Sequence, residues 1–553
     1  RALTLAIPEI SASSLTTISG LLALSFMKIK IGEDMSLVLI KAILFLMLTV
    51  FPFYMKDRYA KLGQSKFDFF LIVSAACLIP AGAAALLDRL EGEAKERRKL
   101  SCLDMAVAAY TLSACVSWLF AADKSGAWTG VDGWMMGLRT QLVFGRIYFL
   151  TSRYFPWTKI IFAGHFLASG AVFFLGILHR FSIDPLGMYE GLGEKTQRMF
   201  LSTIGQASWY SSYVCTVLVL GIVVFLLAES GIWRIALGIY CMLGFSTIVT
   251  QNSDSAFAAT AFLFLGVFIV SCGSLDRLER FFELLLLMFG SFKLIGILQI
   301  LFPENAVQLD GLSVFFSQST TVWVLFLLTC IAYIVLLFYR QAHEGKTEIK
   351  SAGLWRRGAC ILTGAGIVGY VFTVWANTTG LLKQWFGFSS TNQYLLFDRY
   401  WGNSRGFSWK FTMETFGGFP LLKKLVGVGP DSFSMYCYAD GELTRELNRY
   451  FGHDQMLTNA HNEFLNVLFC MGLIGLAAFA AVFAAACVRF FKARRLAPFA
   501  LAGLLAALVY GAHDFFCYQQ VCCTPFLFLI LGMAENSVRN RQKTAENDMV
   551  KTT

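Results

Sequence analysis

Apolar blocks of about 20 residues recur along most of the chain and are separated by short polar connections. A helix of about 20 residues crosses the roughly 30 Å hydrocarbon core of a bilayer, and lipid requires each crossing segment to satisfy its own backbone polar groups. Of the 553 residues, 56% are hydrophobic and only 15% are charged, whereas a soluble protein carries about 25% charged residues. We therefore expect an all-α, polytopic transmembrane helical bundle.

The apolar blocks predict about 12–14 membrane spans with no soluble domain between them. The blocks cover residues 35–54, 67–87, 104–121, 134–150, 158–179, 207–228, 235–249, 254–272, 282–301, 314–339, 358–376, 464–487, 497–513 and 521–537. A further apolar stretch at residues 15–27 is shorter than a span and fits either a clipped helix or a signal-like segment. The organisation predicted is one membrane domain, made of an N-terminal transmembrane region (1–376), one large loop (377–463) and C-terminal transmembrane hairpins with a tail (464–553).

The orientation of the bundle is predicted from loop charge, because short cytoplasmic loops are enriched in lysine and arginine. Segments 340–357, 488–496 and 539–543 are basic and lie an even number of spans apart, so all three fit the cytoplasmic side. Segment 377–463, with eight basic and eight acidic side chains among its 87 residues, is then extracytoplasmic. The sequence therefore predicts a multi-pass protein of the cytoplasmic membrane.

Two other basic loops conflict with this orientation. The loops at 55–66 and 88–103 are separated by a single predicted span, so they cannot both be cytoplasmic if that span crosses the membrane. Either residues 67–87 do not cross, or one loop breaks the charge rule. The net charge of +10 comes mainly from such loops, and no basic stripe or binding motif accompanies it, so nucleic acid is not expected as a partner.

Chemically competent side chains concentrate in segment 377–463. His461 opens the run His461-Asn462-Glu463 and is predicted to lie in the first turn of a membrane helix, where the helix dipole disfavours imidazolium and attracts an anion. A neutral imidazole can act as a general base, and simple capping of the helix is the alternative. Arg405 and Trp409 are four residues apart and would share a helical face. They suit contact with a phosphate and a sugar ring or headgroup, or plain anchoring at the interface.

A turn is predicted between these two groups, in Gly427-Val428-Gly429-Pro430-Asp431-Ser432-Phe433. Two glycines and a proline within four residues favour a turn, and Pro430 suits the first positions of a following helix. A G-x-G pair alone is a weak signal. No cluster of histidine, aspartate and glutamate has the spacing of metal ligands, so neither a metal nor another cofactor is expected.

The order of these motifs, followed by Gly472-Leu473-Ile474-Gly475, resembles the signature region of the O-antigen ligase and polymerase family of membrane glycan transferases. In that family an arginine and a tryptophan precede a G-V-G-P-G-x-F turn. A large periplasmic loop then ends in an H-N-E or similar run before a G-L-I-G span. The resemblance covers the C-terminal part of the chain, and the remainder agrees in hydropathy only.

Two further segments resemble the family more faintly. Residues 198–213 begin with Arg198 but carry Gln206 where the family has asparagine, and residues 250–256 carry Asp254 where an arginine is common. The family's arginine at that point contacts the lipid pyrophosphate. The resemblance therefore implies that another arginine supplies this charge, or that the donor differs. Arg198, Arg139 and Arg146 are the candidates.

The resemblance implies a GT-C-like fold and metal-independent, inverting transfer of a glycan from a polyprenyl-diphosphate carrier to a hydroxyl acceptor on the outer face of the cytoplasmic membrane. The acceptor is a glycan, a lipid-anchored sugar or a protein, and both a ligase and a polymerase fit the motifs. The residues implied are His461 and Arg405 for catalysis, and Arg198, Trp409, Gly427, Gly429, Asn462 and Glu463 for substrate binding. Glu463 is expected to point away from His461 on a helix.

The alternative function is a polysaccharide or lipid transporter or flippase. Such a protein would need ionisable residues at the bilayer midplane or broken helices in matched halves. No internal repeat is evident in the sequence, and His165, Arg139 and Arg146 are the only central ionisable residues that stand out. The long outer loop also favours the enzyme.

Overall fold

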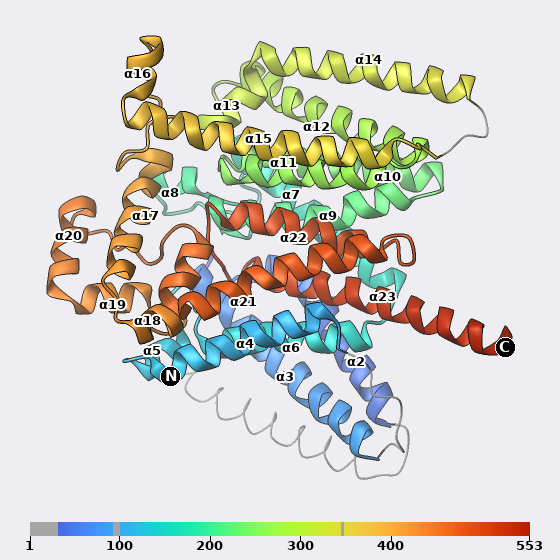
Figure 1. The fold of residues 1–553 in the computed structure, drawn as a ribbon, viewed down its shortest axis with the longest axis horizontal. Coiled ribbons are helices and arrows are strands. Elements are labelled where there is room, and N and C mark those ends of the chain that lie inside the picture. The colour runs from blue at the N-terminus through green and yellow to red at the C-terminus, as the bar shows by residue number, and fades with distance from the viewer. Residues whose placement is uncertain (1–30, 92–99, 344–347, 553) are drawn as a thin grey trace.

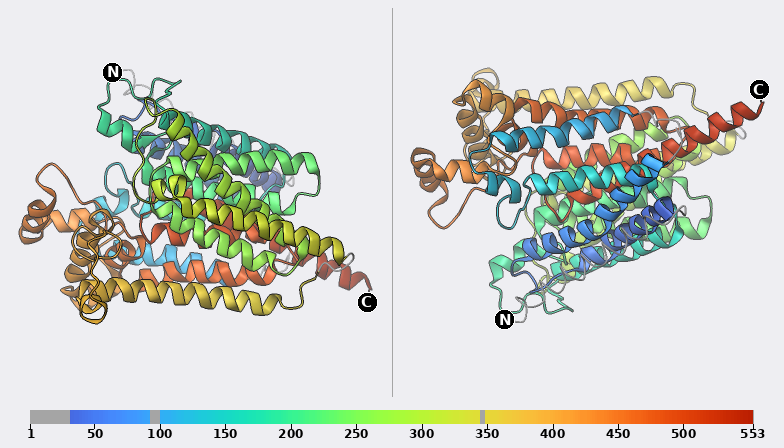
Figure 2. Two further views of the ribbon diagram at one scale, coloured as in Figure 1. Left: turned by 90° about the horizontal axis from the view of Figure 1, so that it is seen from above. Right: turned by 90° about the horizontal axis from the view of Figure 1, so that it is seen from below.

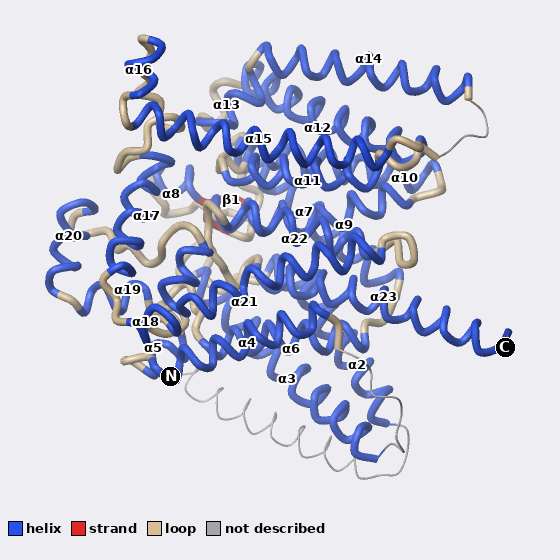
Figure 3. The backbone as a smooth tube through the Cα atoms, in the orientation of Figure 1, coloured by secondary structure: helices blue, strands red, loops and turns tan. Residues whose placement is uncertain are grey.

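The computed structural model describes residues 31–91, 100–343 and 348–552, so the apolar stretch at 15–27 lies outside it. Within these ranges the chain is helical nearly throughout, and the longest helices lie alongside one another in one bundle (Figure 1, Figure 3). The paired strands of the described residues are two residues long, β1 (Phe200–Leu201) and β2 (Gly205–Gln206). The predicted all-α architecture is confirmed.

Each of the fourteen predicted spans coincides with a helical segment. These are α2 (Ile31–Phe45) continued by η1 (Leu46–Val50) and η2 (Phe51–Phe53), α3 (Leu62–Glu91), α4 (Cys102–Phe120), α6 (Leu138–Tyr154), α7 (Lys159–Arg180), α9 (Ala207–Leu227), α10 (Gly231–Thr250), α11 (Ser255–Ser271), α12 (Leu275–Leu301), α13 (Gly311–Gln318) with α14 (Thr320–Ala342), α15 (Ala352–Thr378), α21 (Glu463–Ala493), α22 (Ala500–Asp514) and α23 (Thr524–Thr552). Among the described residues, nine helices are long and apolar enough to cross a membrane, and three apolar segments are shorter. These lengths and compositions define a multi-pass helical membrane protein.

Short helices gather at one end of the bundle (Figure 1, Figure 2). They are α5 (Lys124–Thr129), α8 (Glu194–Met199), α16 (Leu381–Phe386), α17 (Trp401–Gly417), α18 (Leu421–Val426), α19 (Phe433–Ala439) and α20 (Gly441–Phe451). Most of them belong to segment 377–463. The basic ends of α14, α21 and α23 lie at the opposite end of the bundle (Figure 1), which agrees with the predicted separation of the polar segment from the basic loops.

The first of the two conflicting N-terminal basic loops uses charge in local contacts. Helix α3, which follows it, has the length and apolar composition of a membrane span between residues 62 and 83. In the loop at 55–66, Arg58 forms an ion pair with Glu190. The Lys66 ammonium donates to the backbone oxygens of Phe51 and Pro52 at 2.9 and 2.8 Å. Positive charge in this loop is therefore used in local contacts.

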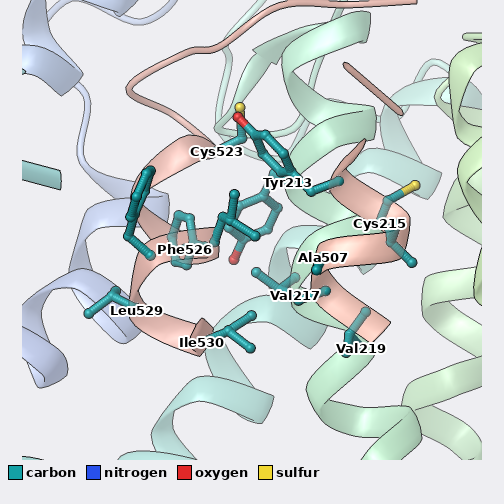
Figure 4. Close-up of a cluster of buried hydrophobic side chains, with 14 of the residues drawn as sticks. Tyr213, Cys215, Val217, Val219, Ala507, Cys523, Phe526, Leu529 and Ile530 are labelled. Carbon is teal, nitrogen blue, oxygen red and sulfur yellow. The ribbon is translucent and has the colours of Figure 1, made fainter. Parts of the chain in front are cut away.

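Helix α9 forms the centre of the bundle. Its most hydrophobic stretch is 89% buried, the largest share among the nine long apolar helices. Tyr213 of α9 meets the ring of Phe526 of α23 edge-on, with 5.0 Å between centroids, and Val217 lies in the same buried cluster as Ala507 of α22 (Figure 4). A helix that is hydrophobic on all sides is stable only when neighbours or lipid surround it, and here it is surrounded by protein.

The glycine-rich turn packs directly against a kink in α21. Gly427 has a φ of 77°, and a Cβ added to it would lie 2.2 Å from the oxygen of Cys470. Gly472, inside α21, has a φ of 69°, and its added Cβ would lie 2.3 Å from the carbonyl carbon of Leu425. The Gly429 N–H donates to the oxygen of Cys470 at 2.9 Å. Backbone meets backbone here, which requires glycine at both positions.

Replacing Gly427 with alanine is expected to destabilise the protein by at least about 1–2 kcal/mol, because a left-handed backbone alone costs this much for an L-residue and the new methyl group meets α21. Thermal unfolding of the detergent-purified protein measures the loss. Gly441→Ala is the control, since a Cβ there meets nothing within 4 Å. Equal melting temperatures for the two variants would contradict this packing.

Candidate functional site

The loop that joins α22 to α23, residues 515–523, lies at the end of the bundle where the short helices gather and contacts both predicted catalytic residues. The oxygen of Phe516 accepts from Arg405 Nε at 2.8 Å. The Gln519 N–H donates to Glu463 Oε2 at 3.0 Å. The Tyr518 ring meets the His461 ring edge-on, with 5.2 Å between centroids. Three of the predicted residues are thus gathered around one short loop.

Arg405 and Trp409 lie on the same face of α17, as predicted. Residues 402–404 have left-handed backbone angles, so regular helix geometry begins at Arg405. The indole of Trp409 lies nearly parallel to the Phe516 ring, with centroids 6.2 Å apart and 26° between planes, and its Nε1 donates to the His461 oxygen at 3.4 Å. Arg405 Nη1 donates to Gly402 O at 2.6 Å. The guanidinium is half-buried and is held by backbone oxygens, and no carboxylate of the described residues is bonded to it.

His461 stands just before α21 and is not in its first turn, which corrects the prediction by two residues. Asn462 is the N-cap, and its side chain accepts from the Leu465 N–H at 3.1 Å. His461 has a left-handed φ of 50°, and its N–H donates to Asn459 Oδ1 at 2.9 Å. Burial, and then the neighbouring Arg405 guanidinium, lower the pKa of His461 to about 3. The imidazole is therefore neutral at physiological pH, as expected for a helix mouth.

A cavity lies beside this group. It is lined by side chains from three parts of the chain, Tyr110, Trp134, Met136 and Gln141, then Pro430, Asp431, Asn459, Glu463, Asn466, Val467, Cys470 and Met471, then Tyr518 and Gln519. Glu463 is 3% exposed and lines the cavity together with Tyr518. Tyr518 also touches the imidazole of His461, so it lies between the cavity and the histidine.

The segment at 250–256 joins the site through Ser255. The Ser255 hydroxyl lies 3.1 Å from His513 Nε2 and accepts from the Cys517 thiol at 3.3 Å. Asp254, where the family pattern has arginine, accepts from the Tyr394 hydroxyl at 2.7 Å and from the Leu312 N–H at 3.0 Å. Asp254 therefore ties the start of α13 to the polar segment.

The arginines named as replacements for the missing charge are not in this group. Arg198 and Arg146 are exposed, and Arg139 lies over the Phe67 ring at 4.5 Å. Sequence reasoning missed Arg180, which is 1% exposed and donates from Nε to the Thr250 oxygen at 2.6 Å. Its Nη2 has no hydrogen-bond partner among the described residues. Arg180 is the last residue of an apolar block, where arginine is usually an exposed flanking charge, so the sequence pattern did not indicate that it is buried.

The glycines predicted to bind substrate have packing roles. Gly427 abuts α21, and a Cβ on Gly429 would lie 2.7 Å from the Cβ of Ala121. Helix α19 begins at Phe433 with Ser432 as N-cap, so Pro430 precedes the helix instead of lying in its first positions. Within the described ranges, no three histidine, cysteine or acidic side chains are grouped as metal ligands would be.

The fold and the gathered side chains define the class of protein: a multi-pass helical membrane protein with a polar site at one end of its bundle. The sequence matches no model of a protein family and no curated protein. Tyr518 meets the His461 imidazole, which lies near the Arg405 guanidinium, and it also lines the cavity together with Asp431 and Glu463. Such a site can bind an anion and accept a proton within one region.

Asp431 is expected to make stability depend on pH. Its Oδ2 accepts from the N–H groups of Val131 and Met136 at 2.8 and 2.9 Å, but burial raises its pKa to about 7, above the unfolded value of about 3.9. Since the folded pKa is the higher one, this contribution to stability is complete at low pH and is lost as the pH rises through about 7.

Asp431→Asn tests this expectation, since asparagine tolerates the left-handed φ of 54° and its carbonyl can keep both backbone bonds. The melting temperature of the wild type relative to this variant should fall between about pH 5 and about pH 8. Asp454→Asn, at an exposed position, serves as the control. If the difference in melting temperature between the wild type and Asp431→Asn stays constant over this pH range, the Asp431 carboxyl does not titrate as expected.

Proposed function

We propose that the protein is a glycan transferase of the cytoplasmic membrane, which moves an oligo- or polysaccharide from a polyprenyl-diphosphate carrier to a hydroxyl acceptor. The observation that carries the proposal is the contact of Arg405, Trp409 and His461 with one loop, at the end of the bundle where α21 begins. These residues stand in the motif order that resembles the O-antigen ligase and polymerase family. The polar segment 377–463 then faces outward.

Arg405 is proposed to bind the pyrophosphate of the donor. Its Nε and Nη1 are held by backbone oxygens, which fixes the guanidinium plane without neutralising its charge. A fixed guanidinium stabilises the negative charge that grows on pyrophosphate as the sugar–oxygen bond breaks. Trp409 stabilises the position of the loop at 515–523, because its indole stacks on Phe516 and donates to the His461 oxygen.

His461 is proposed to accept the proton of the acceptor hydroxyl. The hydroxyl oxygen bonds to the anomeric carbon, the bond from that carbon to the pyrophosphate oxygen breaks, and the proton passes to the imidazole. One displacement inverts the anomeric centre. The low pKa of His461 keeps the imidazole unprotonated and available, and Asn462 fixes the adjoining helix start.

Arg180 is the better-supported source of the charge that the family pattern places at position 254. Its guanidinium is buried, bonds Thr250 at the start of that segment and has an unused N–H group. A buried cation is costly unless an anion balances it, and Asp310 is close enough to interact with Arg180 electrostatically. A diphosphate would bring a further anion to the unused N–H group of Arg180.

The test replaces His461 and Arg405 separately with alanine and measures polymer at the surface of cells that lack the native gene. Loss of one fixed donor or of a general base typically lowers the rate by about 10²- to 10³-fold, so full-length polymer should disappear. His453→Ala and Arg445→Ala, at exposed positions of the same segment, are the matched controls and should retain polymer. Full polymer from both site variants, inserted at wild-type levels, would refute the assignment.

Proteoliposomes separate the transferase from the flippase alternative. With a fluorescent polyprenyl-diphosphate glycan and a hydroxyl acceptor, a transferase releases the carrier diphosphate and increases the mass of the acceptor. A flippase moves the intact donor between leaflets and forms no covalent product. Leaflet exchange without any covalent product would replace the proposed function with transport.

A further inference from the structure

The cavity beside Tyr518 has room for a group the size of one water molecule. The centre of a water-sized sphere can occupy ≈ 20 Å³ within it, and one water needs about 10–15 Å³ measured in this way. A hydroxyl group has a similar size. An intact sugar ring is larger, so only a substituent of a ring could enter while the ring stays at the mouth.

Two unused polar atoms identify the kind of group that fits. Trp134 Nε1 is a buried donor, and Asn466 Oδ1 is a buried acceptor, and neither has a hydrogen-bond partner among the described residues. Both residues line the cavity. A hydroxyl group accepts and donates at once, so its chemistry matches both atoms, whereas a metal cation leaves the indole N–H unpaired.

The lining of the cavity offers an anion no positive charge. Asp431 and Glu463 both line it, and no lysine, arginine or histidine is among its lining residues. Both backbone N–H donors of Asp431 bond to Oδ2, which leaves Oδ1 for another donor. A phosphate or carboxylate would find no cation here to balance its charge.

We propose that the cavity is a subsite for one uncharged hydroxyl group, held between Trp134, Asn466 and the carboxyl groups of Asp431 and Glu463. Resting on the proposed function, this hydroxyl belongs to the acceptor, because pyrophosphate is drawn to Arg405 and the cavity lining holds no cation. The acceptor is then a sugar whose reacting ring carries no phosphate or carboxylate beside the reacting hydroxyl group.

Saturation-transfer NMR on the purified chain tests the subsite with methyl α-glucoside as the probe. Lauryldimethylamine oxide serves as detergent, because maltoside detergents carry sugar hydroxyls of their own. The glucoside should bind, and glucose 6-phosphate should neither bind nor compete. Asp431→Asn and Glu463→Gln should each weaken binding by up to about tenfold, as loss of one hydrogen bond does.

Two further variants make the result decisive. Trp134→Phe keeps an aromatic ring but removes the indole N–H, so binding should weaken even if Asp431→Asn fails to fold. Glu446→Gln, exposed on α20, should bind as the wild type does. Three outcomes would each overturn the subsite. The first is unchanged glucoside binding in all three site variants, and the second is equal binding of glucose 6-phosphate. The third is binding of glucosamine or sodium ions without binding of the neutral glucoside.

The transfer assay distinguishes failure of the subsite from failure of the proposed function. If glucoside binds with the expected variant effects but no transfer occurs, the subsite stands and the proposed function fails. If transfer occurs and Asp431→Asn leaves the KM for a neutral acceptor unchanged, the proposed function stands and the subsite fails.

Discussion

The loop between α22 and α23 is the constraint on which the site depends. It is irregular backbone at the end of an apolar bundle, where an unpaired N–H or C=O group costs several kcal/mol. The oxygen of Phe516 and the N–H of Gln519 are satisfied by side chains from distant segments, Arg405 and Glu463, and the N–H of Gln520 by Thr524. The loop and these side chains therefore fix one another in place.

This mutual fixing brings groups of different chemistry close together. Tyr518 meets the His461 imidazole, whose pKa is lowered by burial and by the Arg405 guanidinium. Tyr518 also lines the cavity with Asp431 and Glu463, and this lining contains no cation. The roles proposed for the two groups follow from this difference, since a guanidinium attracts an anion and a cavity without a cation suits a neutral hydroxyl group.

The sequence predicted the helices well because their lengths and hydropathy are local properties. It also predicted that Arg405 and Trp409 share a face and that His461 adjoins a helix mouth, since four-residue spacing and helix starts can be read along the chain. It misplaced His461 by two residues, because the cap at Asn462 depends on a side-chain bond to Leu465. It expected Glu463 to point away from His461, and the Glu463 carboxyl bonds the N–H of Gln519, whereas the neighbouring Tyr518 meets the imidazole.

What the sequence determined by itself is the helical membrane class, the ranges of the spans and the polar segment that carries the motifs, because lipid imposes a length and a composition on each span independently of its neighbours. Only the tertiary structure decided that residues near 110, 134, 255, 431 and 518 meet around that segment. It also decided that Gly427 and Gly429 serve close packing and that Arg180 is buried. These outcomes depend on which helices pack together, and hydropathy carries no information about the partner of an apolar helix, since protein and lipid satisfy it equally well.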